Sequence, residues 1–432
     1  MFTAARYVVV DDELTELTPL VEALHGLGTP CIGIHWRPEK LPAPELLRGL
    51  RILFTDLHLT KGHLPPKAHY DTIATMLHGA IQPGRGPYIV VLWTSHEEER
   101  QDFTDRLSVV LPPEKLPLAV LGLDKNKYRE GETFSKVDEL EKDVIASLAG
   151  NAQLQTLLSW EQDVLTAADA TLAQIGGLIP AKFRTINDLP AALDGVLSLL
   201  AKAALGANAE ADPRRAVSQA LAPLLMDRIA NQSSDSRKED LWKSAVTFPV
   251  DTSKLTPDQC AQMNAMVHIA LPNVEHIDRK AWGAVLPLKD APAEIIEAYF
   301  GSSTDQIAAD AFQLKPGQEG CRLVLVRIGA VCDYAQGKNG PVPYVLGLLG
   351  PAKYEKLGKS SPAELTSPFL QIGDKGGLDR LVINPRYIIT LTSSVIALLP
   401  EPIFRVREQL LVTLVAHCST HVVRPGILSF AP

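Results

Sequence analysis

Five short apolar segments separated by amphipathic stretches dominate the first 130 residues, and this pattern constrains the fold most strongly. The apolar segments cover residues 6–10, 31–36, 51–56, 88–95 and 116–125. Each is a continuous run of strand-forming residues, which is typical of strands that are buried on both faces. The intervening stretches, such as residues 70–81 and 96–111, space their apolar residues as helices do. The sequence therefore predicts an α/β domain over residues 1–130, with a doubly wound, five-stranded parallel sheet.

Two further regions follow this predicted domain. Residues 131–277 are expected to form a helical connector, because their apolar residues recur at helical spacing, most clearly over residues 154–175. That stripe fits a helix in the core, an interdomain helix or a homodimer seam, and core packing is the favoured interpretation. Residues 278–432 are rich in strand-forming segments separated by glycine-rich turns, which predicts an α+β domain.

Some elements of these two regions are predicted individually. A helix is expected over residues 135–150, where it closes the α/β domain. Strands are expected in the C-terminal region over residues 321–334, 344–350 and 387–399, and a last helix over residues 404–421.

Charge and composition narrow the function classes. With 42 Lys and Arg against 50 Asp and Glu, the formal net charge is −8, which argues against non-specific binding to nucleic acid or an anionic membrane. No basic recognition helix is evident, so DNA binding is not favoured. The sequence has no apolar run of about 20 residues and no signal region, so the expected location is the cytoplasm. Five scattered cysteines without a CxxC pair argue against a disulfide framework or a zinc ribbon.

Acidic, hydroxyl and basic side chains follow the predicted strands of the first domain. They are Asp11 and Asp12 after the first strand, Asp56 after the third, Thr94 and Ser95 after the fourth, and Lys125 after the fifth. Because the carboxyl ends of parallel strands meet at one edge of the sheet, these side chains are expected to converge. Three carboxylates would repel one another, and a hard divalent cation with oxygen ligands would relieve that repulsion, with Mg²⁺ favoured. A carboxylate beside a cation, a hydroxyl and an ammonium group is able to accept a phosphoryl group.

The same strand ends resemble those of the receiver domain of two-component response regulators. In chain order, VVVDDE resembles the acidic pair, ILFTDL the phosphoacceptor strand, VVLWTS the switch-hydroxyl strand and LGLDKNKY the lysine strand. The resemblance covers residues 1–130, and the interval of 44 residues from Asp12 to Asp56 is usual for receivers. It implies that Asp56 is phosphorylated, that Asp11, Asp12 and Asp56 hold Mg²⁺, and that Thr94 and Lys125 contact the phosphoryl group.

The sequence departs from the receiver pattern at several positions. Thr94 lies 38 residues after Asp56, a longer interval than usual, and residues 60–70 are the expected insertion. Lys127 competes with Lys125 for the role of the conserved-type lysine, and Gly122 stands where many receivers carry an aromatic residue. A flavodoxin-like domain with solvated acids and a receiver-like domain that takes no phosphate are the alternatives.

A further resemblance rests on the receiver-like domain and three short motifs. The receiver-like domain together with the short motifs WEQ, CDYAQ and RPG is similar to receiver-like proteins encoded with histidine kinases in bacterial anti-phage conflict operons, such as Detocs-type systems. It implies a sensor histidine kinase as partner and a role in a phosphorelay that triggers or restrains a defence effector. On this interpretation the protein is a phosphoacceptor, as a regulator or a phosphate sink, rather than an enzyme.

The alternative from a different class is an effector enzyme that the receiver domain controls. Cys332 and Asp333 follow a predicted strand, and the last helix carries His417, Cys418 and His421, with the two histidines one turn apart. A Cys–His catalytic site centred on Cys332, or a zinc site formed with the two histidines, is compatible with these residue types. A structural role for all of them is favoured, because a single Cys with distant histidines is a weak signal.

Overall fold

The chain folds into two compact units. The first comprises Met1–Glu161 and Ser234–Phe248, and the second comprises Gln162–Ser233 and Pro249–Pro432. A computed structural model describes residues 6–423, with the exception of 41, 61–64, 83–85, 131–132, 135–138, 141, 144–145, 147–151, 233–235, 248, 250, 252–253, 338–339, 355–363 and 374–376.

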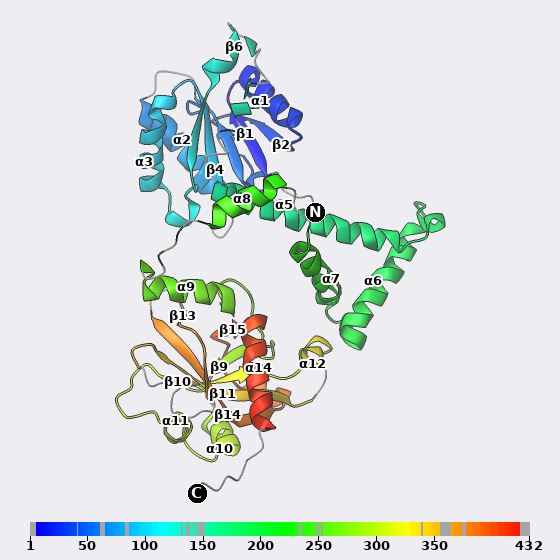
Figure 1. Cartoon of the computed structure of the whole chain (residues 1–432), viewed down its shortest axis with the longest axis vertical. Coiled ribbons are helices and arrows are strands. Elements are labelled where there is room, and N and C mark those ends of the chain that lie inside the picture. Colours follow the sequence, from blue (N-terminus) through cyan, green and yellow to red (C-terminus); the bar gives the residue numbers. More distant parts are fainter. Residues whose placement is uncertain are drawn as a thin grey trace. The chain divides into compact units, whose positions relative to one another are not determined.

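The first unit is built on a five-stranded, all-parallel sheet with the strand order β2-β1-β3-β4-β5 (Figure 1). Its strands are β1 (Tyr7–Asp11), β2 (Cys31–His35), β3 (Ile52–Thr55), β4 (Ile89–Thr94) and β5 (Val120–Asp124). The predicted α/β fold with a five-stranded parallel sheet is confirmed. β5 begins four residues later than predicted, in a segment where Pro117 has no N–H to donate to a neighbouring strand.

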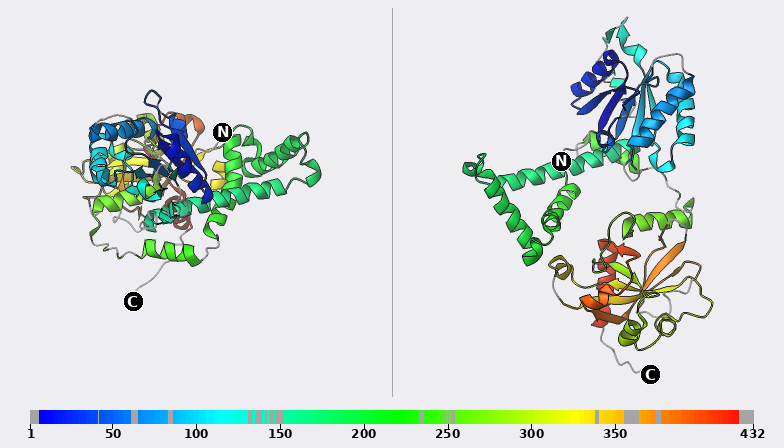
Figure 2. Two further views of the ribbon diagram at one scale, coloured as in Figure 1. Left: turned by 90° about the horizontal axis from the view of Figure 1, so that it is seen from above. Right: turned by 180° about the vertical axis from the view of Figure 1, so that it is seen from behind.

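Helices cover both faces of this sheet (Figures 1 and 2). α1 (Leu14–Gly26) packs on one face, where Val9 of β1 joins Leu17 and Leu20 in a buried cluster. α2 (Pro66–Ala80) and α3 (Arg100–Val110) pack on the other face. Successive residues of a strand point to opposite faces, so the continuous apolar strands supply both cores at once.

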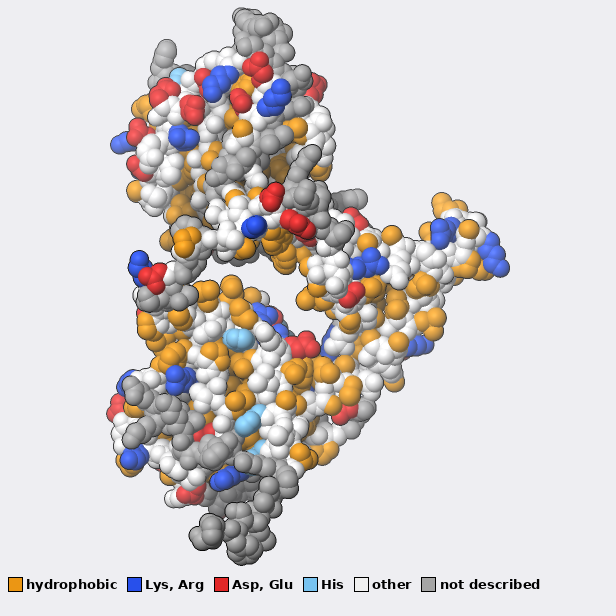
Figure 3. All heavy atoms as spheres, in the orientation of Figure 1, with side chains coloured by type: hydrophobic (Ala, Val, Ile, Leu, Met, Phe, Trp, Pro, Cys, Tyr) orange, Lys and Arg blue, Asp and Glu red, His pale blue; other side chains and the backbone are white. Residues whose placement is uncertain are grey.

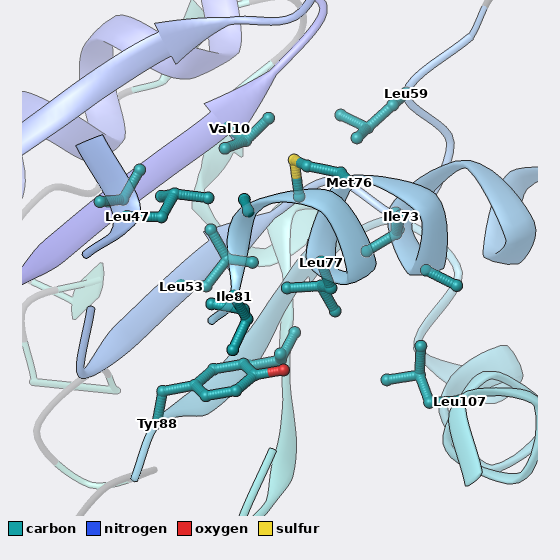
Figure 4. Close-up of a cluster of buried hydrophobic side chains, with 14 of the residues drawn as sticks. Val10, Leu47, Leu53, Leu59, Ile73, Met76, Leu77, Ile81, Tyr88 and Leu107 are labelled. Carbon is teal, nitrogen blue, oxygen red and sulfur yellow. The ribbon is translucent and has the colours of Figure 1, made fainter. Parts of the chain in front are cut away.

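The core under α2 shows how closely this second face is filled (Figure 4). Ile73 and Leu77 of α2 are fully buried against Val10 of β1 and Leu53 of β3, and Leu107 of α3 closes the cluster. α2 begins earlier than the predicted helix because Pro66 occupies its first turn, where the missing N–H costs nothing.

Short elements complete the first unit. They are η1 (Pro44–Leu47), η2 (Glu97–Glu99), η3 (Pro113–Lys115), η4 (Lys125–Tyr128), β6 (Arg129–Glu130), β7 (Thr133–Phe134) and α8 (Ser236–Val246). The predicted helix over residues 135–150 falls largely outside the described residues, as do residues 61–64 of the expected insertion.

The predicted helical connector contains long helices. They are α5 (Ala152–Gly177), α6 (Leu189–Leu205), α7 (Pro213–Ala230) and the short turns η5 (Ala181–Phe183) and η6 (Gly206–Ala209). α5 starts in the first unit and continues into the second as one helix.

One described helical segment, Leu189–Ala209, is long and apolar enough to cross a membrane by length and composition alone, with a mean hydropathy of 1.4. Only 11% of it is buried within the protein, and Figure 3 shows hydrophobic side chains along α6. The sequence prediction had identified no such run. A single segment of this kind is weak evidence for a membrane span, because core helices of soluble proteins and signal sequences pass the same test.

The second unit contains an eight-stranded sheet in which all pairs are antiparallel, with the order β12-β14-β11-β10-β9-β15-β8 and β13 paired with β14. Its strands are β8 (Ile269–Ala270), β9 (Ala284–Pro287), β10 (Arg322–Arg327), β11 (Val342–Pro351), β12 (Leu365–Thr366), β13 (Leu370–Gln371), β14 (Leu378–Leu391) and β15 (Phe404–Val406). The sheet thus begins at Ile269, within the region predicted as connector.

The second unit also contains helices. They are α9 (Pro257–His268), α10 (Ala293–Phe300), α11 (Thr304–Phe312), α12 (Val331–Ala335), α13 (Ser393–Ala397) and α14 (Glu408–Val422). α10 and α11 contribute to one buried cluster, and α14 contributes to the cluster on the other face.

Three predicted elements in this unit have different bounds. The predicted strand over residues 321–334 ends at Arg327, and α12 follows it. In the predicted strand over residues 387–399, residues 393–397 instead form α13, because Thr392 and the two serines after it favour the start of a helix. The first residues of the predicted helix over 404–421 form β15, which pairs with β8 and β9.

Candidate functional site

The strand ends of the parallel sheet bring the three predicted acids together. Asp11 ends β1, Asp12 follows it, and Asp56 directly follows the adjacent strand β3. Because β1 and β3 are parallel neighbours, their carboxyl ends lie side by side. One ligand oxygen from each of the three carboxylates lies within 4.8 Å of the other two. The cluster could therefore hold a metal ion.

Asp56 is held by contacts to both of its carboxylate oxygens. Its Oδ1 accepts a hydrogen bond from the backbone N–H of Leu57 at 2.8 Å, and its Oδ2 lies 3.2 Å from Nζ of Lys125. Asp56 and Lys125 are each only 7% exposed. This ion pair spans two strand ends, and the exposed side chain of Lys127 does not compete for it.

Lys125 has a second acidic partner that the sequence interpretation missed. Its ammonium group donates to Oε2 of Glu16, which lies in the first turn of α1 and is also buried. The sequence signal for Glu16 is faint: it precedes Leu17 and Leu20 on a helix whose buried face would otherwise be apolar. Since both partners are buried, Glu16 fixes the position of the Lys125 side chain beside Asp56.

Asp11 is the carboxyl group that most needs a cation. Its Oδ1 accepts a hydrogen bond from the N–H of Glu13 at 2.8 Å, but its buried Oδ2 has no hydrogen-bond partner. Burial, then the charges of Asp56 and Asp12, raise the pKa of Asp11 to about 7, against the lowering effects of the Glu13 N–H and of Lys125. An unpartnered buried oxygen among three carboxylates is the arrangement that a divalent cation satisfies.

The hydroxyl groups after β4 differ in position. Thr94 is fully buried, and its Oγ1 accepts a hydrogen bond from the N–H of His96 at 3.2 Å. Ser95 lines the pocket above the carboxylates and donates to the side chain of Asn126 at 3.1 Å. Thr94, the residue predicted as the switch hydroxyl, thus lies below the pocket surface, while Ser95 lies on it.

Gly122 of β5 makes room for an acidic side chain. A Cβ atom at Gly122 would lie 2.8 Å from Cγ of Glu97, which is closer than van der Waals contact allows. Glu97 of η2 therefore lies against the strand at the position where the resemblance leads one to expect an aromatic residue. The aromatic element of a receiver switch has no counterpart at this position.

Three histidines line the same pocket, which has a volume of about 350 Å³. The ring of His58 lies between the rings of His69 and His96, at centroid distances of 4.2 and 4.3 Å and with nearly parallel planes. Glu99 lies beside this stack, with its Oε2 3.3 Å from Nε2 of His58. Burial, then the neighbouring His58, lowers the pKa of His69. The sequence interpretation missed this group, because its members come from three separate segments.

The residues of the alternative Cys332 site are not brought together in the described part of the chain. Cys332 lies exposed on α12, with its sulfur 3.8 Å from the carboxylate of Asp333. His417, Cys418 and His421 lie on α14, where burial raises the pKa of the Cys418 thiol to about 11. Among the described residues, neither of the two groups with metal-ligand spacing includes any of these side chains.

Comparison with known proteins gives no match for this chain, whether against protein-family models, curated proteins or solved structures.

Proposed function

We propose that the first unit is a receiver domain in which Asp56 accepts a phosphoryl group from a sensor histidine kinase. The observation that carries this proposal is the geometry at the strand ends, where Asp56 pairs with buried Lys125 beside an unpartnered oxygen of Asp11. In this proposal Asp11, Asp12 and Asp56 hold Mg²⁺, because a site with oxygen ligands alone suits this hard cation. When bound, the cation neutralises charge that develops on the phosphoryl oxygens.

The chain's own groups account for the transfer step. The oxygen of Asp56 that faces Lys125 is the nucleophile, since the Leu57 N–H holds the other one, and it forms the new P–O bond as the P–N bond of the phosphohistidine breaks. The electron pair of the P–N bond remains on the leaving imidazole nitrogen of the kinase. The ammonium group of Lys125, which Glu16 holds in place, then pairs with a phosphoryl oxygen instead of the free carboxylate.

The Thr94 hydroxyl is the group that would respond to the negative charge of a phosphoryl group on Asp56. Its oxygen already accepts the His96 N–H, so its hydroxyl proton is available to donate to a phosphoryl oxygen. A turn of Thr94 toward the pocket would move the segment that carries His96 and η2. Because Gly122 provides no aromatic partner, we expect the signal to leave through η2 and α3 rather than through β5.

The biological setting follows from the second resemblance. We propose a cytoplasmic phosphorelay in bacterial anti-phage defence, in which the protein acts on a downstream effector or drains phosphate from the kinase, and is not itself an enzyme. α5 would supply a homodimer seam, since Leu165 and Leu172 of its apolar stripe are exposed. Binding to nucleic acid or to a membrane is not part of the proposal.

We place the effector enzyme centred on Cys332 second. A reactive thiolate needs a base or a positively charged neighbour. The contact described for the Cys332 sulfur is with the Asp333 carboxylate, which supplies no positive charge.

A phosphorylation assay tests the proposal. The full chain is incubated with Mg²⁺ and acetyl phosphate and its intact mass is measured, with Asp56→Asn as the test variant and Asp105→Asn as the matched control. Asp105 is an exposed acid on α3. We expect one phosphoryl adduct on the wild type and on Asp105→Asn, and none on Asp56→Asn. The absence of any adduct on the wild type, with no detectable Mg²⁺ binding, would contradict the proposal.

A further inference from the structure

The histidine stack and Glu99 contain a second set of metal ligands. One ligand atom each from His58, His96 and Glu99 lies within 4.8 Å of the other two. The set has two imidazole nitrogens and one carboxylate oxygen, whereas the Asp11, Asp12 and Asp56 cluster offers oxygen alone. Imidazole ligands favour borderline metals such as Zn²⁺, Co²⁺ and Ni²⁺ over Mg²⁺.

The Glu99 carboxylate reaches both histidines, one with each oxygen. Glu99 Oε2 lies 3.3 Å from Nε2 of His58, and Glu99 Oε1 lies 3.9 Å from Nδ1 of His96, so only the first separation matches a tetrahedral site without movement. Zinc bonds to nitrogen and oxygen of about 2.0–2.1 Å set the ligands of a tetrahedral site about 3.4 Å apart. The His96 side chain is 44% exposed, so its ring is able to turn out of the stack and direct a nitrogen at the ion.

Neighbouring groups orient the ligands as the outer contacts of metal sites do. The Tyr70 hydroxyl donates to Oε2 of Glu99 at 2.7 Å, which holds the carboxylate in its orientation. The ring of His69 packs against His58, and Thr60 contacts Nδ1 of His69 at 3.3 Å.

We propose that His58, His96 and Glu99 form a second divalent-cation site, selective for Zn²⁺-class metals, in the same pocket as the carboxylate cluster. Three protein ligands leave one coordination position for water or for an oxygen of another ligand. The pocket provides the entry path, because His58 and His96 line it. This proposal does not depend on phosphorylation of Asp56.

Metal titration of the full chain tests the site. The protein is saturated with Mg²⁺ to fill the carboxylate cluster and titrated with Co²⁺ by calorimetry and visible absorption, with His96→Ala and Glu99→Gln as test variants. The matched control is His25→Ala, which removes an exposed histidine of the same unit. We expect one equivalent of Co²⁺ to bind in the presence of Mg²⁺, with at least tenfold weaker binding in both test variants and unchanged binding in the control.

The contrary outcomes are distinct. Co²⁺ that binds equally well to wild type and His96→Ala would overturn the proposal, and so would Co²⁺ that binds only after Mg²⁺ is removed and is lost in Asp12→Asn. A Co²⁺–thiolate charge-transfer band would assign the ion to a cysteine and overturn it as well. None of these results bears on phosphorylation, which the Asp56→Asn assay reports separately.

Discussion

Among single residues, Asp11 is one whose burial lowers the free energy of unfolding when its carboxylate is charged, and favours the binding of a cation. Its folded pKa of about 7 lies well above the ordinary value of 3.8, so between these values the folded state binds a proton that the unfolded state has released. The Asp11 contribution to the free energy of unfolding therefore falls as pH rises from about 4 to about 7, and is constant above that range. A cation at the cluster would replace the proton and recover this loss.

The test is the difference in unfolding free energy between Asp11→Asn and the wild type, measured by urea denaturation from pH 5 to pH 8 without divalent cations. We expect the variant to gain stability relative to the wild type as pH rises, by on the order of 3 kcal/mol at pH 8. Added Mg²⁺ should stabilise the wild type and leave the variant unchanged. A difference that is constant over this pH range would show that Asp11 does not titrate in it.

Sequence alone predicts the site residues that follow the strands. It does not predict those that other segments bring to the site. Asp11, Asp12 and Asp56 were predictable because parallel strands bring their carboxyl ends to one edge. Glu16 was not, because its partner Lys125 lies 109 residues away and nothing local marks the pair. The stack around His58 combines three segments in the same way.

Among the helices and strands, β14 contains a proline that makes it hard to predict from sequence. It runs without interruption from Leu378 to Leu391 and contains Pro385, which argues against a central strand. The sequence analysis predicts strand only from residue 387 onward, so it misses residues 378–386 of β14. The structure accommodates the proline at an irregularity, where the pairing register with β11 shifts between Val345 and Gly347.

Asn384 secures this irregularity, which leads to a prediction. Its buried side chain donates to the carbonyl oxygen of Ala311 at 2.8 Å and accepts from the N–H of Arg386 at 3.1 Å. Replacement by alanine leaves both backbone groups without this partner, so we expect Asn384→Ala to lower the free energy of unfolding by about 1–3 kcal/mol.

Denaturant unfolding of the full chain, followed by circular dichroism, measures this loss. Asn231→Ala is the control, because Asn231 is exposed and bonds only locally to Asp227. The control should change stability by less than about 0.5 kcal/mol. Equal effects of the two substitutions would mean that Asn384 does not hold the strand.

Across the two units, the first is discontinuous in sequence, and no local sequence pattern predicts this. The first unit takes residues up to Glu161 and then Ser234–Phe248, so the polypeptide leaves it and returns. α5 crosses this boundary without a break, and Glu161 of α5 accepts two hydrogen bonds from Arg51, at 2.8 and 2.9 Å. A helical pattern predicts α5, but it carries no information on which unit each part of the helix belongs to.

Because each unit has its own buried clusters, we expect two transitions in calorimetric unfolding. Mg²⁺ at 100 times its dissociation constant should add about 2.7 kcal/mol to one transition only, since all three carboxylates lie in the first unit. Asp11→Asn should abolish that shift. A single transition, or a shift of both by Mg²⁺, would contradict the expected independence.

The surplus of acids around Lys125 also has a kinetic consequence. Asp12, Glu13, Glu16 and Asp56 line the pocket against the single ammonium group of Lys125 in that lining. A dianionic phosphodonor that arrives first is repelled, whereas a donor that arrives after the cation meets a much smaller negative charge, so we expect binding to follow a fixed order. The protein would then be phosphorylated only when the cation and the phosphodonor are present together. Brief exposure to the donor alone would leave it unphosphorylated.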